Sequence, residues 1–279
     1  MHWVIQSNIY AEEGFEGLLA AIKRLNLTYT LVKVIPFVGG LEVVEGAALP
    51  ENGADAIVLG SYTLARVARK ERNWHPGAFL ANLDFEIQRQ HWGDRMLNFD
   101  AKIYKMGAVP EQEKPFFLRP VHDTKAFTGM VCDYPYYQDW VAGLKRMPET
   151  ADPVNDPLGI NLLDLDTPVM VCTKKEIWSE TRVWMLPWGP VTSSGYKIGT
   201  IKRYQAPELT EPRVLEFAHE CHKVWHPNDA YVLDVADTSE GLKIVEVNNL
   251  NSAGFYKGDM LKLLGALEAW AEDGSGLCW

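Results

Sequence analysis

The chain has 279 residues, of which 47% are hydrophobic and 23% are charged. This balance is typical of a globular protein and excludes disordered, collagen-like and coiled-coil chains. The 27 basic and 37 acidic residues give a net charge of −10, which argues against a protein that coats nucleic acid or an anionic membrane, because both need a positive field. A local positive pocket for a small anion is still compatible with this charge. The length predicts about two domains or one composite domain.

The N-terminal segment has no basic stretch followed by an apolar run, so no signal peptide is visible. The apolar runs are far shorter than the ~20 residues that span a bilayer. The cysteines are scattered singly, at Cys132, Cys172, Cys221 and Cys278. A chain of this length buries a core without cross-links, so reduced thiols are expected. We therefore expect a cytoplasmic protein with no membrane partner.

Strand and helix signals alternate over the first 75 residues. Apolar and β-branched runs predict strands, and apolar residues at helical spacing predict helices between them. The predicted strands are 3–5, 31–35 and 54–59, and the predicted helices are 12–25 and 63–71. Strands separated by helices indicate a parallel α/β sheet. No glycine fingerprint follows the first strand, so dinucleotide binding has no support there.

From about residue 95 the pattern changes to mixed strands with helices, which indicates an α+β second part. The stretch 148–157 is rich in Pro, Asp and Asn and predicts a surface loop. Thr210 is a candidate cap of a helix at 211–225. The other predicted elements are strands at 116–118, 169–171, 181–186, 191–198, 230–235 and 242–247, and a last helix at 259–270.

The segment from Tyr231 to Phe255 is the most informative part of the sequence. Asp234 lies on one apolar strand, and Glu246 and Asn248 lie on the next, beyond a turn of composition Asp-Thr-Ser-Glu-Gly. Adjacent antiparallel strands would present all three side chains close together, with Glu246 and Asn248 on one face. Such a site of oxygen ligands suits Mg²⁺, which takes further ligands from water and phosphates. The alternative is a hairpin with solvated acids.

This pattern resembles the magnesium motif of the ATP-grasp superfamily. The segments FFLRPVHDTKAFTG (116–129) and IVEVNNLNSAGFY (244–256) are similar to a sparsely characterised branch found in phages and bacteria. The resemblance covers about residues 95–270. It implies an ATP-grasp fold, with a parallel α/β preface domain and two subdomains that clamp the nucleotide. The implied boundaries are 1–95 for the preface domain, 96–170 for the nucleotide-clamping subdomain and 171–279 for the C-terminal subdomain with the metal motif.

The resemblance also implies a set of nucleotide-binding residues. Arg119 closes a strand whose basic residue reaches the phosphates in ATP-grasp enzymes, and Lys125 follows it; a triphosphate needs cations opposite the metal. A further lysine from the start of the clamping subdomain is Lys102 or Lys105, of which Lys102 is preferred. The adenine is expected near 171–177, against the backbone of residues such as Val171 and Thr173. The alternative for the cations is a solvated surface role.

One feature of the family is weak in this chain. Most ATP-grasp members have a glycine-rich flap in this region, whose backbone amides cover the phosphates. This chain has only Gly129 there. Side chains such as His122, Thr124 and Thr128 are the alternative donors.

Arg182 and Lys197 are the candidate catalytic residues, expected to bind the transferring phosphoryl group or the acceptor carboxylate. Many amide-forming relatives carry an arginine two residues before the first metal aspartate, where this chain has Val232. Arg182 and Lys197 would supply the missing charge. The alternative for Arg182 is an ion pair with Glu180 on one sheet face, worth under ~1 kcal/mol.

The function implied by the resemblance is an ATP-dependent carboxylate–amine ligase with ATP and Mg²⁺ as cofactors. The γ-phosphoryl group would pass to a carboxylate to give an acyl-phosphate, which an amine attacks, with release of ADP. The partners would be small-molecule or peptide carboxylates and amines. A kinase that phosphorylates a small-molecule hydroxyl and a non-catalytic nucleotide-binding module are the alternatives. Dimers are common in the superfamily, so a homodimer is compatible with the resemblance.

Overall fold

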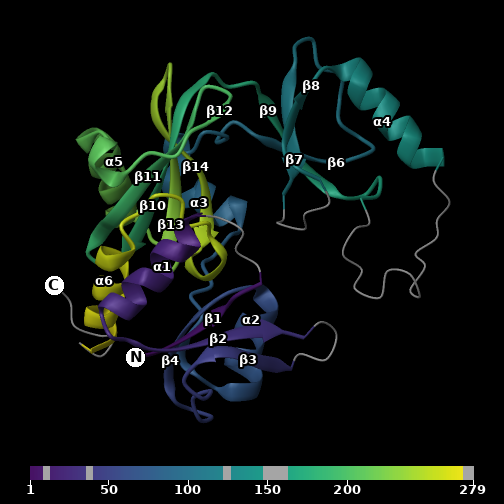
Figure 1. Ribbon diagram of the computed structural model, residues 1–279. Helices are drawn as coiled ribbons and strands as arrows, with labels where there is room; N and C mark the ends of the chain where they lie inside the picture. The colour runs from purple at the N-terminus through teal and green to yellow at the C-terminus, as the bar shows by residue number, and fades with distance from the viewer. Residues whose placement is uncertain (9–12, 36–39, 122–126, 147–162, 273–279) are drawn as a thin grey trace. The chain divides into compact units, whose positions relative to one another are not determined.

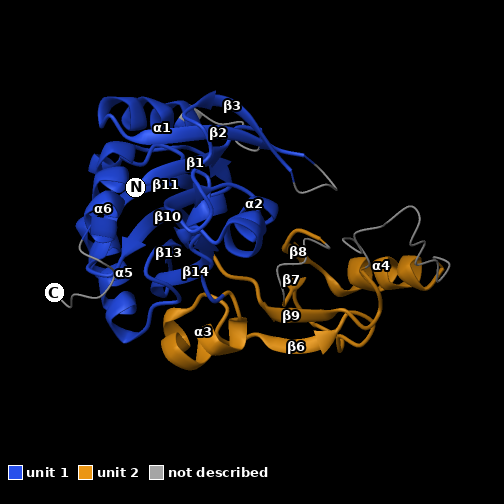
Figure 2. Cartoon of the chain, turned by 90° about the horizontal axis from the view of Figure 1, so that it is seen from below, with its two compact units in different colours: residues 1–82, 177–279 blue, residues 83–176 orange. Residues whose placement is uncertain are grey.

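The computed structural model describes residues 1–8, 13–35, 40–121, 127–146 and 163–272, whose strands form three sheets (Figure 1). The chain separates into two compact units. Unit 1 contains residues 1–82 and 177–279, and unit 2 contains residues 83–176 (Figure 2). The predicted division at residues 95 and 170 stays a prediction, since compactness joins the first and last parts of the chain. The predicted loop at 148–157 lies outside the described residues.

The first sheet of unit 1 has the strand order β3-β2-β1-β4-β5. Strand β1 pairs in parallel with β2 and β4, and β4 pairs in parallel with β5. Strand β3 pairs antiparallel with β2, which corrects the expectation of an all-parallel sheet. The connection between these strands is too short for the crossover that a parallel pair needs. The elements are β1 (His2–Gln6), α1 (Glu13–Arg24), β2 (Thr28–Val34), β3 (Leu41–Gly46), β4 (Asp55–Leu59), α2 (Tyr62–Arg66), η1 (Val67–Arg72) and β5 (His75–Gly77).

The second sheet of unit 1 is antiparallel, in the order β12-β11-β10-β13-β14. Helix α5 begins after Glu211, and the Thr210 hydroxyl instead accepts a hydrogen bond from Ser193 at 2.9 Å. Thr210 is therefore not the cap of α5. The elements are β10 (Ile177–Leu186), β11 (Gly189–Ile198), β12 (Ile201–Lys202), η3 (Pro207–Leu209), α5 (Pro212–Val224), β13 (Tyr231–Thr238), β14 (Gly241–Asn249), η4 (Leu250–Ser252) and α6 (Met260–Glu272).

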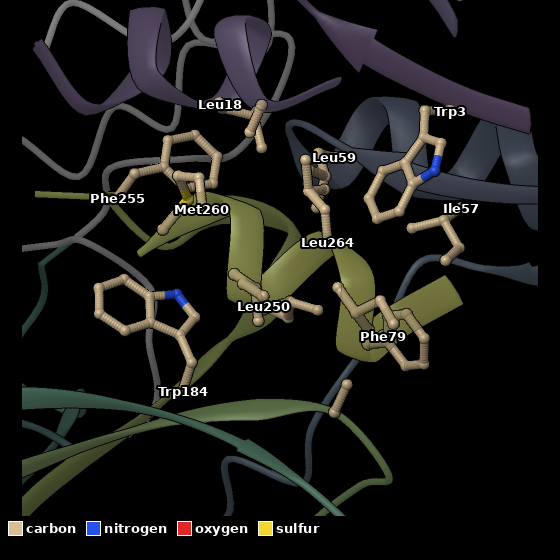
Figure 3. Packing of buried hydrophobic residues seen from close by; sticks show 14 of the residues in the cluster. Trp3, Leu18, Ile57, Leu59, Phe79, Trp184, Leu250, Phe255, Met260 and Leu264 are labelled. Carbon is tan, nitrogen blue, oxygen red and sulfur yellow. The ribbon is translucent and has the colours of Figure 1, made fainter. Parts of the chain in front are cut away.

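One hydrophobic core joins the two sheets of unit 1 (Figure 3). Trp3 and Ile57 come from the first sheet, Trp184 from the second, and Phe255 and Leu264 from the C-terminal segment, all with at most 1% exposure. Burial of such large apolar side chains is the main force that holds these segments together. This core fixes the second sheet, which carries the candidate metal residues, to the N-terminal sheet.

Unit 2 has a four-stranded sheet in the order β6-β9-β7-β8. Helix α4 covers one face of it, with Tyr137 and Val141 packed in a cluster with Phe116, Leu118 and Val171. The elements are α3 (Phe85–Trp92), η2 (Gly93–Arg95), β6 (Lys102–Lys105), β7 (Phe116–Pro120), β8 (Met130–Cys132), α4 (Tyr134–Arg146) and β9 (Pro168–Thr173).

The described cysteines are buried free thiols, as expected: Cys132, Cys172 and Cys221. Burial raises the pKa of the Cys172 thiol to about 12, which makes it a poor nucleophile. Within the described ranges, no helix has the length and apolar character needed to cross a membrane.

Candidate functional site

The acids near the end of the chain lie on neighbouring strands of the second sheet. Asp234 of β13 pairs directly with Glu246 of β14, and Val232 pairs with Asn248. The Asn248 amide nitrogen donates to Asp234 Oδ2 at 3.1 Å and to Glu246 Oε1 at 3.2 Å. Carboxylate oxygens from two strands therefore converge on one atom. The predicted proximity of the three side chains is confirmed.

The local sequence explains this register. Gly241 opens β14 with a φ of +91°, a conformation that glycine adopts without steric cost. The Thr238 hydroxyl closes the turn by donating to the Gly241 carbonyl at 2.7 Å. Next to the Asp234–Glu246 pair the register skips Val245, which forms a bulge. Bulges of this kind re-aim side chains beside functional sites.

Arg182 of β10 lies directly opposite Asp234 on the other side of β13. Its Nε donates to Asp234 Oδ1 at 2.9 Å and its Nη2 donates to Oδ2 at 2.8 Å. This is the planar, bidentate geometry for which arginine is suited. The two side chains are 7% and 1% exposed. The remaining Nη1 donates to the Gly254 carbonyl at 3.2 Å, and the guanidinium lies 4.6 Å from the centre of the Tyr256 ring.

Burial and charge act in opposite directions on Arg182. Burial lowers the pKa of Arg182, but the charge and hydrogen bonds of Asp234 outweigh it, so the pKa lies above its ordinary value. Arg182 therefore stays charged. In a buried pair of this kind, loss of one partner leaves the other charge without compensation.

Glu180 forms a separate cluster on the same strand. Its Oε1 accepts from Lys197 Nζ at 2.5 Å, and its Oε2 accepts from the Tyr196 hydroxyl at 2.5 Å. The alternative that Glu180 pairs with Arg182 is therefore wrong. A register shift follows Glu180 in its pairing with β11, and the carboxylate that Arg182 binds is the directly opposed Asp234. Burial, and then the charges of Asp234 and Glu180, raise the pKa of Tyr196.

The donor set fits a hard divalent cation such as Mg²⁺. Glu180, Asp234 and Glu246 supply three negative charges, and Arg182 and Lys197 supply two positive ones, which leaves one net negative charge. Among the described residues, no group of three or more His, Cys, Asp or Glu side chains is placed to hold a metal. The third donor of the predicted site is accordingly the amide of Asn248, whose oxygen is a ligand type that Mg²⁺ accepts. The convergence of two carboxylates on that amide is the observation that supports this fit.

Two asparagines fix the end of β14 to the first sheet. Asn249 Oδ1 accepts from the Ala81 amide at 2.6 Å, and its Nδ2 donates to the Tyr62 hydroxyl at 2.7 Å. Asn251 and Gly60 exchange two bonds, at 3.0 and 2.6 Å. The sequence indicated polar contacts in this asparagine-rich run, but their partners lie more than a hundred residues away in the chain and gave no signal.

The segment 253–259, here called the Tyr256 loop, follows these asparagines. Its backbone amides are held by hydroxyls of β11: Lys257 N donates to Ser194 Oγ at 3.2 Å, and Asp259 N donates to Thr192 Oγ1 at 2.9 Å. Tyr256 itself has a φ of +47°, which is uncommon for a residue with a side chain. The loop is therefore fixed to the same sheet as the candidate metal residues.

Aromatic rings surround Arg182. The Tyr256 ring stacks with Tyr196, with centroids 5.4 Å apart, and with Tyr204, at 4.8 Å. Arg182 lies over both Tyr196 and Tyr256, where the electron-rich ring faces attract its cation. The sequence gave no signal for this group, because its members are dispersed along the chain.

In unit 2, strand pairing places the predicted phosphate-binding residues on particular faces. Lys102 pairs with Val171, and Arg119 pairs with Met170. Directly paired residues share a face, and Val171 belongs to the core with α4. Lys102 therefore lies on the α4 side, whereas Arg119 lies on the other face. Lys105, an odd number of positions after Lys102, shares the face of Arg119, which favours Lys105 over Lys102.

The remaining predicted nucleotide residues have local partners within unit 2. Thr173 donates its hydroxyl proton to Asp100 Oδ2 at 3.0 Å, and Lys175 donates to the same oxygen at 3.0 Å. Arg119 Nε donates to the Pro120 carbonyl at 3.2 Å. Lys125 lies outside the described residues. The roles assigned to these residues stay predictions.

The fold and the site together define an ATP-grasp protein. The structure matches that of a RimK domain protein ATP-grasp from Sphaerobacter thermophilus with a TM-score of 0.58 and 14% identity, over 94% of this chain and 98% of that chain. The model of an ATP-grasp domain family, the third family of its clade, matches residues 51–267, and the chain belongs to this family. A search of curated proteins gave no significant match. ATP-grasp domains bind ATP and typically Mg²⁺, and they are typically found in ATP-dependent ligases.

Proposed function

We propose that the protein is an ATP-dependent carboxylate–amine ligase, which forms an amide or peptide bond through an acyl-phosphate and releases ADP. The observation that carries this proposal is the convergence of Asp234 and Glu246 on the Asn248 amide. It occurs in a chain of the ATP-grasp family. A site for a divalent ion in an ATP-binding fold is what phosphoryl transfer requires.

The residues of unit 1 have separate roles in this proposal. Asp234, Glu246 and Asn248 hold Mg²⁺, which when bound neutralises the β- and γ-phosphates and orients the γ-phosphoryl group. Lys197 is the candidate for binding the transferring phosphoryl group or the acceptor carboxylate. Its side chain is 35% exposed, so it is open to a ligand while Glu180 holds its ammonium in place. Arg182 was predicted to share this role, although its fork is bound to Asp234.

Unit 2 supplies the nucleotide-binding residues. Arg119, Lys125 and either Lys102 or Lys105 hold the phosphates, as cations that match a polyanion. The backbone near Val171 and Thr173 contacts the adenine. These are proposals from the family pattern.

The chemistry needs little covalent help from the protein. A carboxylate oxygen attacks the γ-phosphorus as the bond to the bridging oxygen of ADP breaks, which gives the acyl-phosphate. The amine nitrogen then attacks the acyl carbon, phosphate leaves, and the nitrogen loses a proton. Binding and charge neutralisation by the named residues lower the barrier through positioning and electrostatic stabilisation.

The test is a screen of carboxylates and amines for release of ADP and phosphate, with Glu246→Gln as the inactive variant. Glu240→Gln is the control, because Glu240 is an exposed acid in the β13–β14 turn. Release that requires both a carboxylate and an amine supports the ligase. A stable phosphorylated product formed without an amine indicates the kinase instead. Release of AMP and pyrophosphate, or nucleotide binding without turnover of any pair, contradicts the proposal.

A further inference from the structure

We propose that Arg182 is a positioning residue that couples the metal ligand Asp234 to the Tyr256 loop. This inference rests on the proposed function, because it takes Asp234 as a metal ligand. It assigns Arg182 a role that acts through Asp234 rather than at the substrate. Metal binding and the order of the loop are then linked through one guanidinium.

The first step concerns what Arg182 has available. Its Nε and Nη2 are both bonded to Asp234, its Nη1 is bonded to the Gly254 carbonyl, and its plane lies on the Tyr256 ring. The side chain is only 7% exposed. A guanidinium with its fork and one face engaged in this way holds its neighbours in place.

The second step concerns rigidity. Guanidinium is planar, so the direction of Nη1 is fixed once the fork lies on Asp234. A shift of the Asp234 carboxylate therefore moves the donor that holds Gly254. The reverse also holds, since a coupling between two sites acts with equal size in both directions.

The third step concerns the loop. It is bonded to β11 through Lys257 and Asp259, and it is closely packed against α1, where a Cβ built on Gly14 would lie 2.6 Å from the Tyr256 carbonyl oxygen. The loop has little free space on that side. Arg182 is the described side chain that bonds both to this loop and to a candidate metal ligand, so it is the link between them.

The test measures metal affinity and loop order separately. Mn²⁺ serves as the probe and is titrated by electron paramagnetic resonance, while hydrogen exchange follows the amides of residues 253–259. Arg182→Lys keeps the charge and loses the fork. Arg213→Lys is the matched control, because Arg213 makes a bidentate pair with Asp237 of the same strand, at 3.3 and 2.6 Å, outside the metal site.

We expect Arg182→Lys to weaken Mn²⁺ binding by about tenfold, within the range typical of such couplings, and to speed exchange of Lys257 and Asp259. Mn²⁺ should slow exchange of this loop in the wild type and not in Arg182→Lys. Gly14→Ala, which displaces the loop without touching a charge, should also weaken Mn²⁺ binding, and it keeps the test decisive if Arg182→Lys does not fold.

Wild-type Mn²⁺ affinity together with wild-type loop exchange in Arg182→Lys would overturn the inference, as would equal effects of Arg213→Lys. If the wild type binds no Mn²⁺, the metal assignment of the proposed function fails. In that case faster loop exchange in metal-free Arg182→Lys still supports the tie between Arg182 and the loop, and unchanged exchange overturns it.

Discussion

Arg182 and Asp234 are opposed on β10 and β13 and share two hydrogen bonds of 2.9 and 2.8 Å, with almost no solvent contact on either side chain. Asp234 is thus both the partner of a buried cation and the central acid of the candidate metal site. This double role makes its two functions separable by experiment, because stability reports the ion pair and metal affinity reports the site.

Asp234→Asn should reduce the free energy of unfolding by about 3–5 kcal/mol, because it leaves the buried Arg182 charge uncompensated. Urea denaturation measures this. The control is Asp237→Asn, which removes the partner of Arg213, a cation with a 48% exposed side chain, and should cost under about 1 kcal/mol. Equal losses in the two variants would show that the Arg182–Asp234 pair is not a special stabilising feature.

Lys197→Met should lower kcat/KM by about tenfold or more once a substrate pair is known, because a cation beside the reacting groups is lost. Lys202→Met is the matched control, since Lys202 pairs with Lys197 across β11 and β12 and is exposed. Steady-state kinetics at a temperature where both variants are folded separates the outcomes. Unchanged kcat/KM in Lys197→Met would leave Lys197 with the structural role of holding Glu180.

His222 should make the protein less stable in mild acid. Burial lowers its pKa below the ordinary value of about 6.5, against the Pro187 carbonyl, which raises it, and with small contributions from His226 and His219 that lower it further. Its nitrogens contact the Tyr231 hydroxyl at 3.0 Å and the Pro187 carbonyl at 2.9 Å. The unfolded chain thus binds a proton more readily than the fold does.

The sign of this effect follows from linkage. The stabilisation is complete above about pH 6.5 and is lost as the pH falls below that value. Thermal unfolding from pH 8 to pH 5 should show the loss in the wild type and a smaller one in His222→Gln. His226→Gln is the control, because His226 is less buried than His222. A slope that His222→Gln does not change would rule out His222 as its source.

Asn249→Ala should cost about 1–3 kcal/mol of stability, because its bonds of 2.6 and 2.7 Å to Ala81 and Tyr62 join β14 to the first sheet and would leave buried groups unsatisfied. Asn228→Ala is the comparison, since Asn228 donates an exposed bond to the Leu80 carbonyl at 2.9 Å. Chemical denaturation of both variants checks the difference. A larger loss in Asn228→Ala would contradict this description of the junction.

The proximity of Asp234, Glu246 and Asn248 was predictable because a hairpin is local: one turn and a period of two residues decide it. The Arg182–Asp234 pair was not, since its register depends on two strands that are 52 residues apart. Spacing alone suggested Glu180 as the partner of Arg182, but Arg182 binds the directly opposed carboxylate instead.

The same distinction applies to the fold. Amphipathic helices and buried strands follow from local periodicity, and most predicted elements have counterparts in the structure. Thr210 has the chemistry of a helix cap, but a non-local bond from Ser193 engages its hydroxyl. Lys102 and Lys105 are alike in sequence, and only the pairing of β6 with β9 tells which of their faces α4 covers.

The central claim is that Asp234, Glu246 and Asn248 hold Mg²⁺ for a bound nucleotide. Calorimetric titration of Mg²⁺ in the presence of a non-hydrolysable ATP analogue tests it most directly, in the wild type, Glu246→Gln and the exposed control Glu240→Gln. The account expects the wild type and Glu240→Gln to bind equally, and Glu246→Gln to bind about tenfold or more weakly, because a charged oxygen ligand is lost. Equal Mg²⁺ affinity in all three proteins would contradict the account.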